Sequence, residues 1–123
     1  MDHVTVTDPQ IEPKGWGEEV IIINCSEYCG KILRFKKGTR GSLHFHIKKH
    51  ETWFVLRGTI ELSTVDLDNA RKTVRAVGVG QVVDIPRMSP HQVCALEDTD
   101  IMEVSTPHEE TDSYRVLPGD SQK

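Results

Sequence analysis

Gly38–Gly58, GTRGSLHFHIKKHETWFVLRG, is the stretch that decides the fold of this chain. His44 and His46 lie one residue apart in it, and Glu51 follows five residues after the second histidine. Side chains two residues apart on a β-strand point to the same face. A strand over Leu43–Ile47 therefore directs both imidazoles to one side of a sheet.

A second apolar run opens at Glu51 and continues through Trp53–Leu56. We expect it to lie antiparallel to the first strand, after a turn at Ile47–His50. Two imidazoles and a carboxylate from neighbouring strands suit a divalent metal ion that keeps open coordination positions. A lone His-x-His pair is also common as a surface or structural pair, so this stretch alone leaves both interpretations open.

A further single histidine follows a proline-bounded turn. Gly80-Gln-Val-Val-Asp-Ile-Pro86 leads through Arg87-Met-Ser-Pro90 to His91. Together, the two stretches resemble the two signature motifs of the cupin superfamily. The first motif is a glycine, five residues, His-x-His, three or four residues, a glutamate, six residues and a glycine, and Gly38–Gly58 matches it without a gap.

The second motif is a glycine, five residues, Pro-x-Gly, two residues, a histidine, three residues and an asparagine. Gly80, Pro86 and His91 match it, whereas Met88 replaces its second glycine and Ala95 its asparagine. Neither substituted position supplies a metal ligand in the family, so the departure concerns the geometry of the turn. The resemblance implies one divalent metal ion, such as Zn²⁺, Mn²⁺, Fe²⁺ or Ni²⁺. The ligands it implies are His44, His46, Glu51 and His91.

The composition is that of one small globular domain. The chain has 123 residues, of which 37% are hydrophobic and 28% charged, and its formal net charge is −4. This length suits a single domain over residues 1–123. The acidic balance favours neither nucleic acid nor an anionic membrane as a partner. The longest apolar run near the start, Val20–Ile23, is far shorter than a signal-peptide core or a membrane span needs, so we expect a cytoplasmic protein.

Short runs of β-type residues with turn signals between them predict eight or nine strands and no amphipathic helix longer than two turns. The runs are 20–24, 31–37, 43–47, 53–56, 60–65, 73–77, 81–85, 91–96 and 101–105. Residues 1–14 are expected to form an extended arm and residues 106–123 a C-terminal tail. The pattern fits an all-β fold, the double-stranded β-helix or jelly-roll barrel of cupins. We expect its apolar lining to include Leu43 or Phe45, Phe54, Leu56, Ile60, Val83 and Ile85, and the sequence alone leaves open which parity faces inward.

A closer resemblance is to the cupin portion of type II mannose-6-phosphate isomerases. Lys14-Gly-Trp16-Gly17 is similar to the segment that precedes that portion, and Asp112-Ser-Tyr-Arg115-Val116 to its closing segment. Ile101-Met-Glu103-Val104 and the first motif, continued through Lys49 and Trp53, are also similar. Family members commonly carry glutamine where this chain has His44.

This resemblance implies isomerisation of a sugar or a sugar phosphate. The metal would bind the carbonyl oxygen and the adjacent hydroxyl and stabilise an enediolate while a general base moves the proton. Glu103 is the candidate base, provided that its strand runs beside the strand that carries His91. Cations near the motifs are candidates for binding a phosphate group. These substrate-binding candidates are Arg40, Lys49, Arg87 and Arg115.

Two other functions stay open at this point. The same ligands suit an oxygen-using cupin dioxygenase, and they also suit a non-catalytic module that binds a sugar or another small molecule. His50 is expected to point away from the site, and His108 is interpreted as a residue of the tail. By resemblance to small cupins, we expect a homodimer formed through edge strands, with the N-terminal arm exchanged between subunits.

Overall fold

The computed structural model describes residues 2–123, which contain eleven β-strands and two short 3-10 helices. The strands are β1 (Gln10–Lys14), β2 (Gly17–Asn24), β3 (Cys29–Phe35), β4 (Leu43–Phe45), β5 (Glu51–Arg57), β6 (Thr59–Asp66), β7 (Arg71–Gly78), β8 (Val82–Ile85), β9 (His91–Ala95), β10 (Thr99–Ser105) and β11 (Tyr114–Leu117). The helices are η1 (Glu110–Asp112) and η2 (Asp120–Gln122). Among the described residues, no helix has the length and apolar character that crossing a membrane requires.

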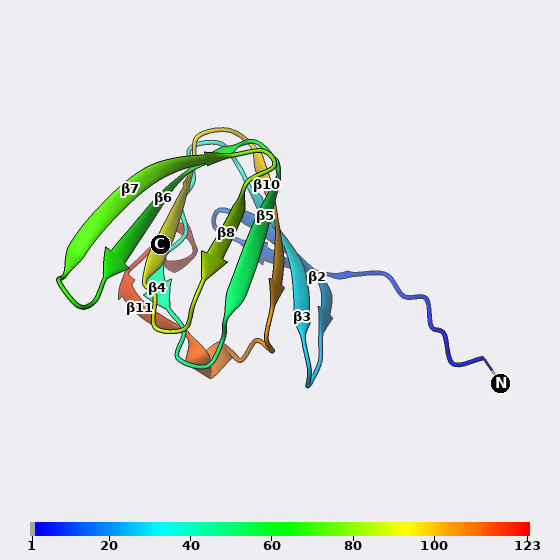
Figure 1. Ribbon diagram of the computed structural model, residues 1–123. Coiled ribbons are helices and arrows are strands. Elements are labelled where there is room, and N and C mark those ends of the chain that lie inside the picture. Colours follow the sequence, from blue (N-terminus) through cyan, green and yellow to red (C-terminus); the bar gives the residue numbers. More distant parts are fainter. Residues whose placement is uncertain (1) are drawn as a thin grey trace.

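The strands form two antiparallel sheets that face each other (Figure 1). The six-stranded sheet has the order β1-β2-β3-β10-β5-β8, and the five-stranded sheet the order β11-β4-β9-β6-β7. Consecutive strands often lie in different sheets, as in a jelly roll. The all-β fold predicted from the sequence is confirmed.

The two ends of the chain contribute more to the fold than the sequence predicts. Residues 10–14 of the expected arm form β1 and pair with β2, so that residues 2–9 project from the body (Figure 1). Residues 114–117 of the expected tail form β11 and pair with β4. The C-terminal segment is therefore part of the five-stranded sheet.

The expected pairing of the first-motif strands with each other is wrong. β4 pairs with β11 and β9, whereas β5 pairs with β10 and β8 in the other sheet. The chain crosses between the sheets at residues 46–50, where the backbone N–H groups of 47–49 bond to the Asp112 side chain instead of to a hairpin partner. His44 and Glu51 consequently approach each other across the barrel.

The core lies between the sheets and follows the alternation of the strands. On β5, Trp53 and Val55 are 3% and 0% exposed, whereas Phe54 and Leu56 are 41% and 40% exposed. The expectation that Phe54 and Leu56 line the barrel is therefore wrong, because an uninterrupted apolar run carries no information on which parity faces inward. Val55 lies in register with Ile101 on β10, which is also 0% exposed.

The motif glycines stand where the backbone turns sharply. Gly38, Gly58 and Gly80 have φ values of 83°, 86° and 84°, in the region that favours glycine. Met88, which replaces the second glycine of the second motif, adopts a φ of 65° and donates its backbone N–H to the carbonyl oxygen of His46 at 2.7 Å. The turn before His91 therefore has a left-handed backbone despite the substitution.

We expect Gly58→Ala to lower the free energy of unfolding by roughly 2–5 kcal/mol, because a positive φ is combined with a collision of the new Cβ with the backbone of Asp98 and Thr99. Gly78→Ala is the matched control, since a Cβ at Gly78 meets no atom within 4 Å. It should stay within about 1 kcal/mol of the unsubstituted protein. Urea unfolding followed by tryptophan fluorescence measures both, and equal unfolding midpoints would contradict the argument.

Candidate metal centre

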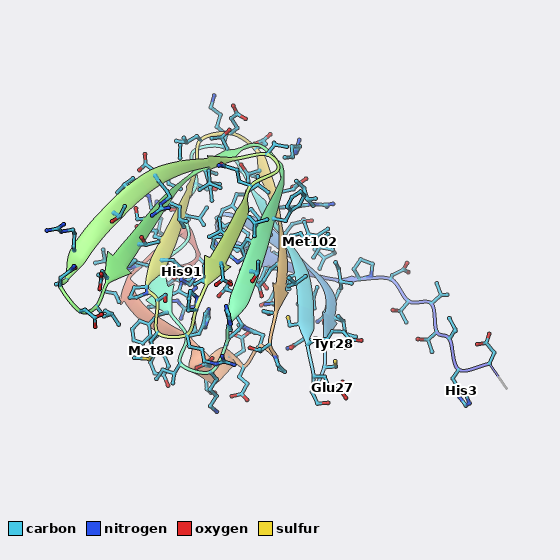
Figure 2. The ribbon with its side chains drawn as sticks, in the orientation of Figure 1. His3, Glu27, Tyr28, Met88, His91 and Met102 are labelled. Atoms are coloured by element: carbon cyan, nitrogen blue, oxygen red, sulfur yellow. The ribbon has the colours of Figure 1, made fainter. Side chains whose placement is uncertain are left out.

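Three imidazoles meet between the two sheets. His44 belongs to β4, His91 begins β9 in register with His44, and His46 follows β4. The ring centroid of His44 lies 4.5 Å from that of His91 and 5.0 Å from that of His46. One nitrogen of each ring lies within 4.8 Å of the others. His91, labelled in Figure 2, is 2% exposed, so these nitrogens converge in a buried space where they can hold a metal ion.

Each imidazole is oriented by a backbone carbonyl oxygen near its Nδ1 atom. The pairs are His46 with Asp112 at 3.0 Å, His91 with Ser89 at 2.8 Å, and His44 with Ser42 at 3.1 Å. A carbonyl oxygen only accepts hydrogen bonds, so the contacts of His46 and His91 place the proton on Nδ1 and leave a free lone pair on Nε2. Nδ1 of His44 also lies 3.0 Å from the Ser42 hydroxyl, which can donate or accept. Metal-binding histidines are commonly held in this way.

Glu51 adds a buried carboxylate from the opposite sheet. Its Oε1 accepts a hydrogen bond from Trp53 Nε1 at 2.7 Å, which leaves Oε2 3.2 Å from His46 Nε2 and 3.8 Å from His91 Nε2. Glu51 Oε2 and His91 Nε2 are buried and have no hydrogen-bond partner among the described residues. Electron-rich atoms that face each other in a buried space need a cation between them. The site therefore fits one divalent metal ion.

The charge states of these groups also suit a metal ion. Burial lowers the pKa of His44 to about 3, with further lowering by the charges of His91 and His46, and burial likewise lowers the pKa of His91. Burial by itself would raise the pKa of Glu51, but the close approach of His46 and the charge of Lys49 outweigh it and lower this pKa. Neutral imidazoles and an ionised carboxylate are the forms that bind divalent cations.

A second buried cluster adjoins the histidines and is centred on Lys49. Lys49 Nζ donates a hydrogen bond to Glu103 Oε2 at 3.1 Å and lies 3.2 Å from His108 Nδ1 and 3.9 Å from Glu51 Oε2. Lys49 and Glu103 are 4% and 3% exposed. Both clusters line one cavity of about 120 Å³ between the sheets.

Glu103 reaches this cavity by a route that differs from the expected one. β10 pairs with β3 and β5, so the expectation that it runs beside the His91 strand is wrong. The register sets Glu103 between Lys31 on β3 and Trp53 on β5. All three side chains point inward, because they occupy the same parity in neighbouring strands.

The four predicted substrate-binding cations divide into two pairs. Lys49 and Arg115 line the cavity, whereas Arg40 and Arg87 are not among its lining residues. The backbone of Arg40 bonds to Asp120, and Arg87 Nε donates to the carbonyl oxygen of Lys48 at 2.7 Å. The structure therefore brings only Lys49 and Arg115 to the candidate site.

His50 and His108 differ in their position relative to the cavity. His50 Nε2 lies 2.7 Å from Asp84 Oδ1 outside the cavity, as expected. His108 was predicted to be a residue of the C-terminal tail without a role at the site. It lines the cavity, and its ring centroid lies 6.2 Å from that of His46. The Asn24 side chain holds the backbone of His108 through hydrogen bonds of 2.9 and 3.0 Å across 84 residues of sequence. No local pattern could have revealed a contact over that separation.

Asp112 in η1 fixes the crossover that carries His46 and Lys49. Its carboxylate accepts hydrogen bonds from the backbone N–H groups of residues 47, 48 and 49, at distances from 3.0 to 3.2 Å. Its carbonyl oxygen accepts the bond from His46 Nδ1 described above. A single residue of the C-terminal segment therefore positions groups in both clusters.

Comparisons with known proteins identify the family and the fold. Residues 31–107 match the family described as the Cupin domain. Similar solved structures are of oxalate decarboxylase from Bacillus subtilis: a Trp-to-Tyr variant with a TM-score of 0.79 and 21% identity, an Arg-to-Ala variant with 0.79 and 22%, and a study of its Mn(II) centres with 0.76 and 21%. Each alignment covers 94% of this chain and 34% of the other, so the chain spans about a third of those proteins, and the likeness shows the fold. No curated protein matches the sequence.

We expect His46→Ala and His91→Ala each to lower the bound metal at least about tenfold, because each removes a converging nitrogen. His50→Ala is the matched control and should keep the metal content of the unsubstituted protein, since His50 lies outside the cavity. Elemental analysis after reconstitution with a single metal measures all three variants. Full metal content in both the His46 and the His91 variants would rule out the site.

We expect Asp112→Ala to lower the free energy of unfolding by about 2–4 kcal/mol at neutral pH, because three backbone N–H groups lose a charged acceptor. Asp68→Ala, at an exposed hairpin tip, is the control and should change it by about 0.5 kcal/mol or less. Burial tends to raise the pKa of Asp112, but the three backbone hydrogen bonds lower it overall.

The pH dependence of the stabilisation by Asp112 follows from its lowered pKa. The Asp112 carboxylate stabilises the fold above the pKa of an unfolded aspartate, about 3.9, and this contribution is lost as the pH falls through the lower pKa of the folded state. The difference between Asp112→Ala and the unsubstituted protein should therefore shrink in acid. Urea unfolding at a series of pH values tests this, and a difference that grew in acid would contradict it.

Proposed function

The chain belongs to the cupin family, and from this premise we propose that it is a metal-dependent enzyme that transfers a proton within a small, oxygen-rich substrate. The observation that carries the proposal is a pair of buried carboxylates in one cavity, Glu51 and Glu103, whose pKa values are displaced in opposite directions. Such pairs commonly divide the roles of charge stabilisation and proton transfer.

Glu51 takes the first role in this proposal. Together with His44, His46 and His91 it would hold the metal, since its lowered pKa keeps the carboxylate ionised. When bound, a divalent cation supplies a Lewis acid that polarises a carbonyl group and stabilises negative charge on a substrate oxygen.

Glu103 takes the second role. Burial and the charge of Glu51 raise its pKa, although Lys49 opposes this, and a raised pKa favours exchange of a proton near neutral pH. Lys49 Nζ and Ser105 Oγ both donate hydrogen bonds to Glu103 Oε2 at 3.1 Å. These bonds orient the carboxyl group and leave Oε1 for a proton of the substrate.

The cavity favours a small anionic substrate. Its volume of about 120 Å³ is well below the roughly 300–1,000 Å³ of pockets for drug-sized ligands. Arg115, which lies in register with His44 and lines the cavity, is a candidate anchor for a carboxylate or phosphate group. We therefore retain the isomerase-type proton transfer implied by the resemblance to mannose-6-phosphate isomerases, but propose a hydroxy-carbonyl compound smaller than a hexose phosphate.

A second candidate is decarboxylation of a small dicarboxylate. It is favoured by the small cavity and by the likeness of 94% of the chain to oxalate decarboxylase structures. The oxygen-using dioxygenase and the non-catalytic module considered from the sequence are outcomes of the same experiment.

The experiment uses protein reconstituted separately with Mn²⁺, Fe²⁺, Zn²⁺ and Ni²⁺ and incubated with small hydroxy-carbonyl compounds in D₂O, with and without oxygen. We expect deuterium incorporation next to the carbonyl group, detected by NMR, that does not require oxygen. Glu103→Gln should lower this rate by about 10²- to 10⁴-fold while metal content is retained. Glu61→Gln, on an exposed position of β6, is the control and should keep the full rate.

Other results would point elsewhere. An unchanged rate in Glu103→Gln would exclude Glu103 as the proton-transfer group. Release of CO₂ from dicarboxylates without isotope exchange would favour decarboxylation, and oxygen consumption would favour a dioxygenase. Ligands that protect the protein against heat and are never converted would identify a binding module.

A further inference from the structure

A second cavity lies at the side of the barrel where β7 and β8 diverge. A turn at residues 78–81 joins the two strands, but β7 is an edge of the five-stranded sheet and β8 an edge of the six-stranded sheet. The strands therefore separate as they leave the turn (Figure 1). The space between them, which we call the β7–β8 cavity, has a volume of about 400 Å³ and is lined by residues of β6, β7, β8 and the segment 86–91. Pockets that bind small molecules commonly have volumes of roughly 300–1,000 Å³.

The floor of the β7–β8 cavity is apolar. Leu62 on β6, Val77 on β7 and Ile85 on β8 line it and are 3%, 5% and 4% exposed, so the cavity reaches the hydrophobic core. Val83 on β8 also lines it and packs against the same core. Water at an apolar floor has few hydrogen-bond partners, and an apolar group displaces it favourably. The floor therefore suits the apolar part of a ligand.

A single arginine stands beside this floor. Arg75 on β7 lies in register with Leu62 on β6, so its side chain projects from the same inner face and lines the cavity. In the described part of the chain, no acidic side chain lies within ion-pair distance of the Arg75 guanidinium group. Two N–H groups of a guanidinium match the two oxygens of a carboxylate. Arg75 can therefore bind the anionic group of a ligand.

The other polar residues of the cavity do not oppose an anion. Asp84 is the one acidic residue that lines it, and the Asp84 carboxylate has partners outside the cavity: His50 Nε2 lies 2.7 Å from its Oδ1, and Thr52 Oγ1 donates to the same atom at 2.9 Å. Gln81 Oε1 accepts a hydrogen bond from the backbone N–H of Gly78 at 2.8 Å, which leaves the NH₂ group of the Gln81 side chain as a further donor.

We propose that the β7–β8 cavity binds a small monocarboxylate that carries an apolar chain or ring. The carboxylate pairs with Arg75, and the apolar part covers Leu62, Val77 and Ile85. One cation sets the charge of the ligand, because a second negative charge would lie against the apolar floor without a partner. The ligand therefore belongs to a different chemical class from the small oxygen-rich substrate proposed for the metal centre.

The proposed site is separate from the metal centre. His91 lines both cavities, whereas His44, His46 and Glu51 line only the first. The imidazole of His91 consequently stands between the two cavities. Binding of a monocarboxylate in the β7–β8 cavity requires neither the metal ion nor the proton transfer proposed above, so its test does not depend on either.

An NMR titration of the ¹⁵N-labelled protein with octanoate tests the proposal, and octanamide is the uncharged comparison. Arg75→Gln should weaken octanoate binding about 10- to 100-fold, because a charged hydrogen-bond donor is lost, and should leave octanamide binding unchanged. Arg71→Gln is the matched control, since Arg71 lies on the same strand but does not line the cavity. It should bind octanoate as tightly as the unsubstituted protein. Equal octanoate affinities of Arg75→Gln and the unsubstituted protein would overturn the proposal.

Two further variants locate the ligand. Val83→Phe fills part of the cavity and should weaken octanoate binding at least about tenfold, and circular dichroism verifies that this variant is folded. His46→Ala should keep octanoate binding, because His46 does not line the β7–β8 cavity. Octanoate binding that is lost in His46→Ala and kept in Val83→Phe would instead place the carboxylate on the metal ion. That result, or an absence of octanoate-dependent shifts at the Arg75 and Val83 amides, would contradict the assignment.

Discussion

The structure depends on one electrostatic constraint, the convergence of lone pairs in a buried space. Glu51 Oε2 and His91 Nε2 face each other without hydrogen-bond partners, and neither atom has a way to turn outward. The carbonyl oxygen of Ser89 holds one ring, and the indole of Trp53 holds the carboxylate. In an interior of low dielectric constant, polar atoms left without partners lower the stability of the fold. A divalent cation bound by both atoms would remove this cost, so metal binding and the stability of the barrel are linked.

The topology explains why a barrel suits this centre. His44 and His91 stand on the five-stranded sheet, and Glu51 stands on the six-stranded sheet. A cation between them joins the two sheets at the point where their inner faces meet. Glu103 lies on the same sheet as Glu51 and close to it through Lys49, so the carboxylates that we propose for metal binding and for proton transfer share one rigid support. Sites built on strands hold their geometry better than sites built on loops.

Local spacing was enough to predict that His44 and His46 share a face, because i and i+2 positions of a strand point the same way. His91 was added by the resemblance to the cupin motifs. The same spacing could not predict how segments far apart in the sequence pair with each other. The pairing of β4 and β5, the neighbours of β10 and the inward parity of β5 all depend on contacts between distant segments. The contacts that His108 and Asp112 make at the site were not predicted for the same reason, since their partners lie 84 and 63 to 66 residues away. Met88 shows a further limit, because a residue can adopt a backbone conformation that its type disfavours when the surrounding turn demands it.

The hydrogen bond between His46 and Asp112 has a consequence for the folding of the newly synthesised chain. A ribosome releases Asp112 only after 66 further residues have followed His46, and until then the ring has no carbonyl oxygen to hold its proton and its plane. A nascent chain that ends before Asp112 already contains His44, His46 and His91 but lacks the acceptor that orients the His46 ring. The geometry of the site is therefore complete only after the C-terminal segment that carries Asp112 has been synthesised and has packed over the crossover.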